Sequence, residues 1–135
     1  AVNKAIELAP SFGARKALKL PVSAPFHCSL MTQAADEMRD ALIDAKIQDP
    51  ITPIISNVTA TSEVSKDRII KLLIEQVTGR VRWAETIRYA KENNVEKIYE
   101  IGAGKILTGL VKRIDETLNS IAIDDPNQID KFQLD

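Results

Sequence analysis

The strongest constraint on the fold is an alternation of short apolar runs and helical patterns in the second half of the chain. The segment VEKIYEI at 95–101 holds an expected strand of about five residues. It is followed by a glycine turn, a helix pattern from about 105 to 114 and a second apolar run at 119–124 (NSIAID). Strands that alternate with helices are typical of parallel sheets, because each parallel connection needs a crossover. The pattern therefore predicts an α/β fold.

The rest of the chain also reads as short elements. Apolar residues three and four positions apart predict amphipathic helices, and short β-prone runs predict strands. Ser65 is a suitable N-cap and Gly79 a suitable end for one of the helices. The expected helices are 1–10, 30–46, 65–79, 82–94 and 125–134, and the further expected strands are 16–22 and a buried one within 52–60.

Composition sets outer limits on function. The 135 residues suit one domain-sized core, and 44% hydrophobic with 27% charged residues is typical of a globular protein. Binding to nucleic acid or anionic membranes needs a basic face, which a net charge of −1 does not indicate. One cysteine cannot form an internal disulfide, and no apolar run approaches the roughly 20 residues of a membrane span, so we expect a cytoplasmic protein. The first residues already show helical rhythm without a methionine, so we expect part of a longer protein.

The glycine turn GAGKILTG invites comparison with nucleotide-binding loops. The GxGxxG pattern requires a third glycine where this chain has Leu107, and the next glycine, Gly109, comes two positions late. A tight strand-to-helix turn, with N–H groups that can face an anion, is the better interpretation.

The only histidine and the only cysteine are adjacent, in APFHCSLM at 24–31. One histidine and one cysteine are too few ligands for a zinc site, and neighbours in an extended segment point to opposite sides. Free cysteines are mostly buried, which favours a packing role for Cys28. A lone histidine is usually structural, yet His27 lies between a proline-restricted segment and a helix start, a rigid mount for a general base.

A histidine base needs a nucleophile to activate, and the sequence offers none of the expected kind. A serine nucleophile in hydrolase-like folds lies in a GxSxG elbow, which does not occur in these residues. Two other polar side chains remain open to either interpretation. Asn57 could orient a loop or simply form a turn, the commoner role, and Trp83 is expected to pack the start of a helix.

Four separated motifs, LPVSAPFHCSLM, SNVTA, EQVTGRVRW and YEIGAGKILTGLVKRI, resemble in this order the malonyl-CoA:acyl carrier protein transacylases of bacterial type II fatty-acid synthesis. The resemblance covers nearly the whole chain and matches the C-terminal portion of that family. It implies the C-terminal part of an α/β-hydrolase-like parallel-sheet domain, residues 21–135, preceded by the tail of a ferredoxin-like small subdomain, residues 1–20.

The resemblance also implies roles for two residues. His27 falls on the family's catalytic histidine, and Gln76 on the residue whose backbone carbonyl receives the histidine's ring N–H. The family's GxSxG serine, its malonate-binding arginine and a glutamine near the oxyanion hole find no match here, and we expect them in a missing N-terminal half. The chain alone is therefore expected to be inactive.

The activity implied for the intact enzyme is malonyl transfer from malonyl-CoA to the pantetheine thiol of acyl carrier protein, through a malonyl-serine intermediate and with no cofactor or metal. The alternative is a non-catalytic binding or scaffold module that keeps the fold without the nucleophile. Lys105, Lys112 and Arg113 could attract the acidic carrier protein or form an ordinary solvated face. Missing partner strands would also favour self-association of the chain.

Overall fold

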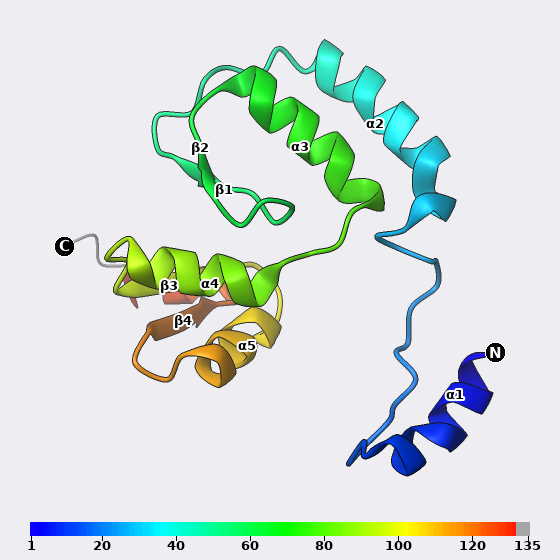
Figure 1. Ribbon diagram of the computed structural model, residues 1–135. Coiled ribbons are helices and arrows are strands. Elements are labelled where there is room, and N and C mark those ends of the chain that lie inside the picture. Colours follow the sequence, from blue (N-terminus) through cyan, green and yellow to red (C-terminus); the bar gives the residue numbers. More distant parts are fainter. Residues whose placement is uncertain (132–135) are drawn as a thin grey trace.

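The computed structural model of the protein describes residues 1–131. Its helices and strands follow, with short 3-10 turns between or after them, in the order α1 (Val2–Leu8), α2 (Thr32–Asp44), β1 (Ile54–Ile55), β2 (Ser62–Glu63), α3 (Lys66–Thr78), α4 (Trp83–Glu92), β3 (Lys97–Ile101), α5 (Ile106–Ile114) and β4 (Asn119–Ile123). Figure 1 shows three groups along the chain: α1 by itself, α2 and α3 with the β1–β2 hairpin, and α4, α5 and the β3–β4 sheet. Within residues 1–131, no helix is both long and apolar enough to span a bilayer.

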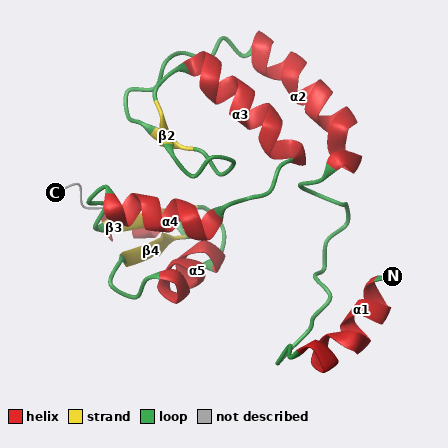
Figure 2. Ribbon diagram, viewed as in Figure 1, coloured by secondary structure: helices red, strands yellow, loops and turns green. Residues whose placement is uncertain are grey.

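The predicted strand–helix–strand unit is confirmed. Strand β3 (Lys97–Ile101) pairs in parallel with β4 (Asn119–Ile123), and α5 (Ile106–Ile114) forms the crossover between them. Helix α4 (Trp83–Glu92) packs against α5, and the two helices lie beside the strands in Figure 2. Mixed helices with a small parallel sheet agree with the expected α/β class.

The best-packed core lies inside this unit. Ile87 of α4, Val111 of α5 and Leu118 before β4 are at most 3% exposed and form one cluster. Trp83 packs against the same cluster, so its expected packing role agrees with its contacts. Apolar side chains from two helices and from the segment before β4 thus hold the unit together by burial.

A second group is formed by α2 (Thr32–Asp44) and α3 (Lys66–Thr78), which lie side by side. Leu72 of α3 is only 2% exposed. The α3 N-terminus differs from the prediction in one respect: the Ser65 side chain makes no capping bond, and the Asp49 carboxylate accepts the Lys66 N–H at 2.7 Å instead. A carboxylate from a distant loop thus satisfies a donor that the helix leaves free.

Three predictions about local structure need correction. Residues 16–22 are extended but form no strand, because no other segment of the described chain supplies a ladder of hydrogen bonds. The strand within 52–60 is only β1 (Ile54–Ile55), which pairs antiparallel with β2 (Ser62–Glu63), and Ile54 is 46% exposed rather than buried. The last predicted helix is a 3-10 helix over Pro126–Lys131, and its expected continuation to 134 lies outside the described residues.

The first helix is confirmed as α1 (Val2–Leu8), continued by a 3-10 turn that ends at Gly13 in the left-handed region. Helix α1 stands apart from the other elements in Figure 1, and no residue of it is buried. Apolar side chains along 18–22 are open to solvent as well, with Leu18 69%, Leu20 70% and Val22 62% exposed.

The accessible surface of the chain is large for its size. It measures 10271 Å², whereas a compact monomer of this mass exposes about 7,000 Å². The excess is typical of a chain whose apolar faces find no cover among its own residues. The predicted self-association depends on such uncovered apolar surface. The association itself stays a prediction.

Candidate functional site

His27 lies at the end of the extended segment that leads into α2. Its backbone adopts φ 60°, the left-handed region that few residues other than glycine and asparagine occupy. Next to it, the Cys28 thiol donates to the Pro25 carbonyl at 3.1 Å. Such strain persists only where the surrounding structure holds it, and it is commonest at functional sites.

The imidazole of His27 is held by a residue far away in the sequence. Its Nδ1 lies 2.9 Å from the backbone carbonyl oxygen of Gln76, in the last turn of α3. A carbonyl only accepts hydrogen bonds, so Nδ1 carries the proton and Nε2 of the neutral ring keeps its lone pair. The structure thus brings together the two residues singled out from the sequence, in a geometry that leaves Nε2 free to accept a proton.

The Gln76 carbonyl is free for this contact because α3 ends two residues later, at Thr78. An uninterrupted helix would direct this carbonyl to the N–H of residue 80, but the chain leaves the helix at Gly79, with φ −88° and ψ 156°. Gly79 therefore ends the helix as predicted, without the left-handed conformation typical of a glycine cap. A β-carbon at Gly79 would lie 2.8 Å from the Glu75 carbonyl oxygen, which explains why glycine is needed here.

The histidine faces a groove rather than a closed core. His27 is exposed, and together with Gln76 it borders an open, mostly apolar groove of about 400 Å³ between α3 and the 26–38 segment. Exposure argues against the simplest structural role, a ring buried in the core. Cys28 is half-buried rather than fully buried.

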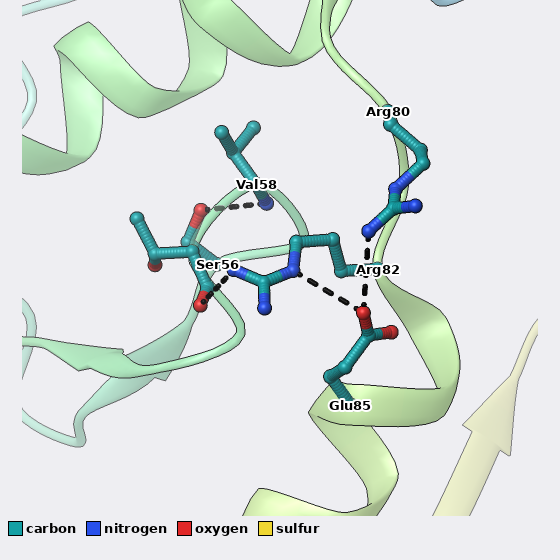
Figure 3. Close-up of polar contacts among 6 residues, drawn as sticks. Ser56, Val58, Arg80, Arg82 and Glu85 are labelled. Carbon is teal, nitrogen blue, oxygen red and sulfur yellow. Dashed lines mark hydrogen bonds and ion pairs between the residues drawn. The ribbon is translucent and has the colours of Figure 1, made fainter.

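The turn at 56–60 connects this site to α4. The side-chain amide of Asn57 donates to Oε1 of Gln76 at 3.5 Å, and the Asn57 carbonyl accepts the Arg82 N–H at 2.8 Å. Figure 3 shows the Arg82 guanidinium beside this turn, where it donates to the Thr59 carbonyl at 3.1 Å and lies 3.4 Å from the Glu85 carboxylate. Arg80 reaches the same carboxylate at 3.3 Å.

Sequence reasoning missed Arg82 and Glu85. The only local signal was their three-residue spacing across a helix start, which is common among surface pairs. Nothing in the sequence indicated that the guanidinium would reach a backbone carbonyl 23 residues away.

A carboxylate of the chain itself occupies the N–H groups that follow the glycine turn. Gly102 and Gly104 have positive φ values of 131° and 98°, as a turn of this sharpness requires. The Glu100 carboxylate from β3 accepts hydrogen bonds from the backbone N–H groups of Leu107 (3.0 Å) and Thr108 (2.7 Å). The N-terminus of α5 is thus occupied by a side chain, which supports the structural interpretation over a nucleotide site.

Glu100 should make stability depend on pH. Hydrogen bonds from Thr108, whose backbone N–H lies 2.7 Å from the carboxylate, and from the backbone N–H of Leu107 hold the pKa of Glu100 below its ordinary value of 4.5. A carboxylate with a lowered folded pKa stabilises the fold above its unfolded pKa, and this contribution is lost as the pH falls through the folded pKa. We expect Glu100→Gln to lower the melting temperature at pH 7 by about 3 to 6 °C, and to weaken its fall on acidification.

Thermal unfolding between pH 3 and pH 7 measures both effects. Glu7→Gln is the matched control, because Glu7 pairs with Lys4 at 3.2 Å on the exposed surface of α1, where an ion pair contributes little. Equal pH profiles for Glu100→Gln and the control would contradict the prediction.

No group of three or more metal-ligating side chains occurs within the part of the chain that the structure describes.

The sequence was compared with known proteins, and the relatives found carry one name. No family model matches the chain. The malonyl CoA-acyl carrier protein transacylase of Escherichia coli K12 is 39% identical over 127 residues, which are 94% of this chain and 41% of that protein. The transacylase of Bacillus subtilis is 42% identical over 129 residues, 96% of this chain and again 41% of the relative.

Solved structures similar to this chain carry the same kind of name as the sequence relatives. An acyl-carrier-protein-S-malonyltransferase from Bartonella henselae superposes with a TM-score of 0.88 at 45% identity, covering 96% of this chain and 41% of that one. A malonyl-transacylase in complex with a type II PKS acyl-carrier protein superposes with a TM-score of 0.86 at 38% identity, covering 96% and 42%. The chain thus spans about two fifths of the length of the proteins it matches, and the resemblance predicted from its motifs is confirmed over nearly all of its own length.

Proposed function

We propose that this chain, a homologue of the malonyl-CoA:acyl carrier protein transacylases, supplies the general base for malonyl transfer from coenzyme A to acyl carrier protein. The observation that carries the proposal is the 2.9 Å contact between His27 Nδ1 and the Gln76 carbonyl. This contact selects the tautomer whose Nε2 can accept a proton, and it orients the ring. In a catalytic triad the acid does the same for the histidine.

The chemistry follows from that tautomer. His27 Nε2 takes the proton of a serine hydroxyl while the serine oxygen attacks the malonyl thioester, and backbone N–H donors stabilise the oxyanion. The protonated histidine then returns the proton to the departing coenzyme A thiolate. In the second half, the same nitrogen takes the proton of the carrier protein's pantetheine thiol, whose sulfur attacks the malonyl ester. The protonated histidine then gives this proton to the departing serine oxygen, which regenerates the serine hydroxyl and the neutral imidazole. The proposal requires no metal or other cofactor.

The serine is not supplied by a GxSxG elbow in these 135 residues, so the proposal places it in protein outside them. The same holds for the arginine that would bind the malonyl carboxylate. We further propose that residues 21–135 form part of a hydrolase-like domain and residues 1–20 the end of a ferredoxin-like subdomain. The relative solved with a bound carrier protein supports an acyl carrier protein as the partner, and a cytoplasmic location fits this role.

The experiment compares two proteins: the 135-residue chain and the full-length product of the gene that encodes it. Each is incubated with malonyl-CoA and phosphopantetheinylated acyl carrier protein, and malonyl-carrier protein is detected by intact mass. We expect transfer by the full-length product and none by the chain alone. Absence of transfer in both, with binding of carrier protein retained, would overturn the proposal in favour of a non-catalytic binding module.

A further inference from the structure

We propose that Asn57 is a positioning residue for His27, and that it acts through the side chain of Gln76. The inference rests on the proposed function of His27 and extends it to a residue that sequence reasoning left as an ordinary turn asparagine. The side-chain amide of Asn57 donates to Gln76 and not to the imidazole, and Asn57 does not line the groove beside His27.

The carbonyl that holds His27 lies in the least constrained part of a helix. Gln76 is two residues from the end of α3, where helices fray because their last carbonyls have no intrahelical partner. Its backbone position therefore needs support from outside the helix. The amide of Asn57 gives that support by donating to Gln76 Oε1 at 3.5 Å. Gln76 is thus held through its side chain while its main chain holds the histidine.

Asn57 can act as an anchor because its own turn is rigidly held. The Ala60 N–H donates to the Ser56 carbonyl at 2.8 Å. Figure 3 shows the second bond of this turn, in which the Val58 N–H donates to Ser56 Oγ at 3.2 Å. From the other side, Arg82 binds the turn twice, with its backbone N–H on the Asn57 carbonyl and its guanidinium on the Thr59 carbonyl. The position of α4 is thereby transmitted through the turn to Gln76.

The resulting path runs from Arg82 through Asn57 and Gln76 to His27, with each step a hydrogen bond. Without the Asn57 donor, the Gln76 carbonyl should lie within hydrogen-bond distance of His27 Nδ1 for only part of the time. The imidazole would then populate its other tautomer, with the proton on Nε2, in which it cannot accept a proton from a serine. We expect binding of malonyl-CoA to stay unchanged, because the proposed role of Nε2 lies in proton transfer.

The test uses the full-length gene product with ¹⁵N-labelled histidine, the His27 signals being assigned by their absence in His27→Ala. In the parent protein, nitrogen shifts should report the Nδ1–H tautomer. Asn57→Ala should move them toward the Nε2–H tautomer and lower kcat for malonyl transfer by roughly tenfold, with KM for malonyl-CoA unchanged. Asn93→Ala is the matched control, because Asn93 also donates a side-chain hydrogen bond, to the Tyr89 carbonyl at 2.8 Å, but at the far end of α4.

A double-mutant cycle separates the stated route from a general weakening of the turn. Gln76→Ala removes Oε1 but keeps the backbone carbonyl, so adding Asn57→Ala to it should change neither the tautomer nor kcat further. Additive losses, or parent-like shifts and kcat in Asn57→Ala, would overturn the inference. Asn57→Leu removes the same donor at nearly the same size, offers no acceptor to the Gln76 amide, and serves if Asn57→Ala does not fold. The nitrogen shifts report the tautomer of His27 even if the protein transfers no malonyl group. A failure of the proposed function can therefore be told apart from a failure of this inference.

Discussion

Replacing His27 by alanine is expected to lower kcat for malonyl transfer in the full-length gene product by about 10³-fold. The substitution removes the nitrogen that takes the proton of the nucleophile in both halves of the reaction. KM for malonyl-CoA should change little, because the imidazole acts mainly in the transition state. The measurement is steady-state transfer to acyl carrier protein, together with the burst of enzyme-bound malonyl groups.

Two further variants show whether the loss is chemical or structural. His27→Asn keeps an N–H donor for the Gln76 carbonyl and suits the left-handed backbone at φ 60°, but it supplies no base, so it should fold well and remain as inactive as alanine. Cys28→Ala changes the adjacent residue, whose thiol donates to the Pro25 carbonyl and not to the imidazole, and should keep at least half of the activity. Activity of His27→Asn within threefold of the parent would show that the histidine is not the base.

Replacing Gly79 by alanine is expected to destabilise the fold by about 1 to 3 kcal/mol. The new β-carbon would lie 2.8 Å from the Glu75 carbonyl oxygen. Neither the β-carbon nor this backbone oxygen can rotate away from the other. The last turn of α3 must therefore shift, and it carries the Gln76 carbonyl with it. Urea denaturation measures the loss of stability, and we expect malonyl transfer to fall as well.

Gly109→Ala is the matched control for this prediction. Gly109 lies inside α5, and a β-carbon there would meet nothing within 4 Å. Alanine should therefore stabilise the helix by about 0.5 to 1 kcal/mol. If both variants changed the free energy of unfolding in the same direction, the steric explanation for Gly79 would be wrong.

Predictions that depended on nearby residues agreed best with the structure. The helix expected over 65–79 is observed over Lys66–Thr78, and the unit β3–α5–β4 lies where its pattern placed it. Helical and crossover patterns are legible because each turn of the helix buries side chains from positions three and four apart. The helix caps were less predictable, since Asp49 and Glu100 cap their helices from outside them.

Residues 16–22 illustrate the opposite limit. Their apolar, extended sequence suits a strand, yet a strand exists only where a second segment completes its hydrogen bonds. No described segment of this chain does so. The sequence therefore carried the preference for an extended backbone but not the pairing, and the same holds for β1, which found only the short partner β2.

The candidate site divides in the same way. From the sequence, His27 was expected to follow a proline-restricted segment and to precede a helix, and the resemblance of the motifs implied that the Gln76 carbonyl receives its ring N–H. The contacts of Asn57 with Gln76 and of Arg82 with Asn57 became visible only in the folded chain. Helix formation depends on neighbours a few positions apart, whereas a hydrogen bond between groups distant in the sequence exists only once packing has brought them within about 3 Å.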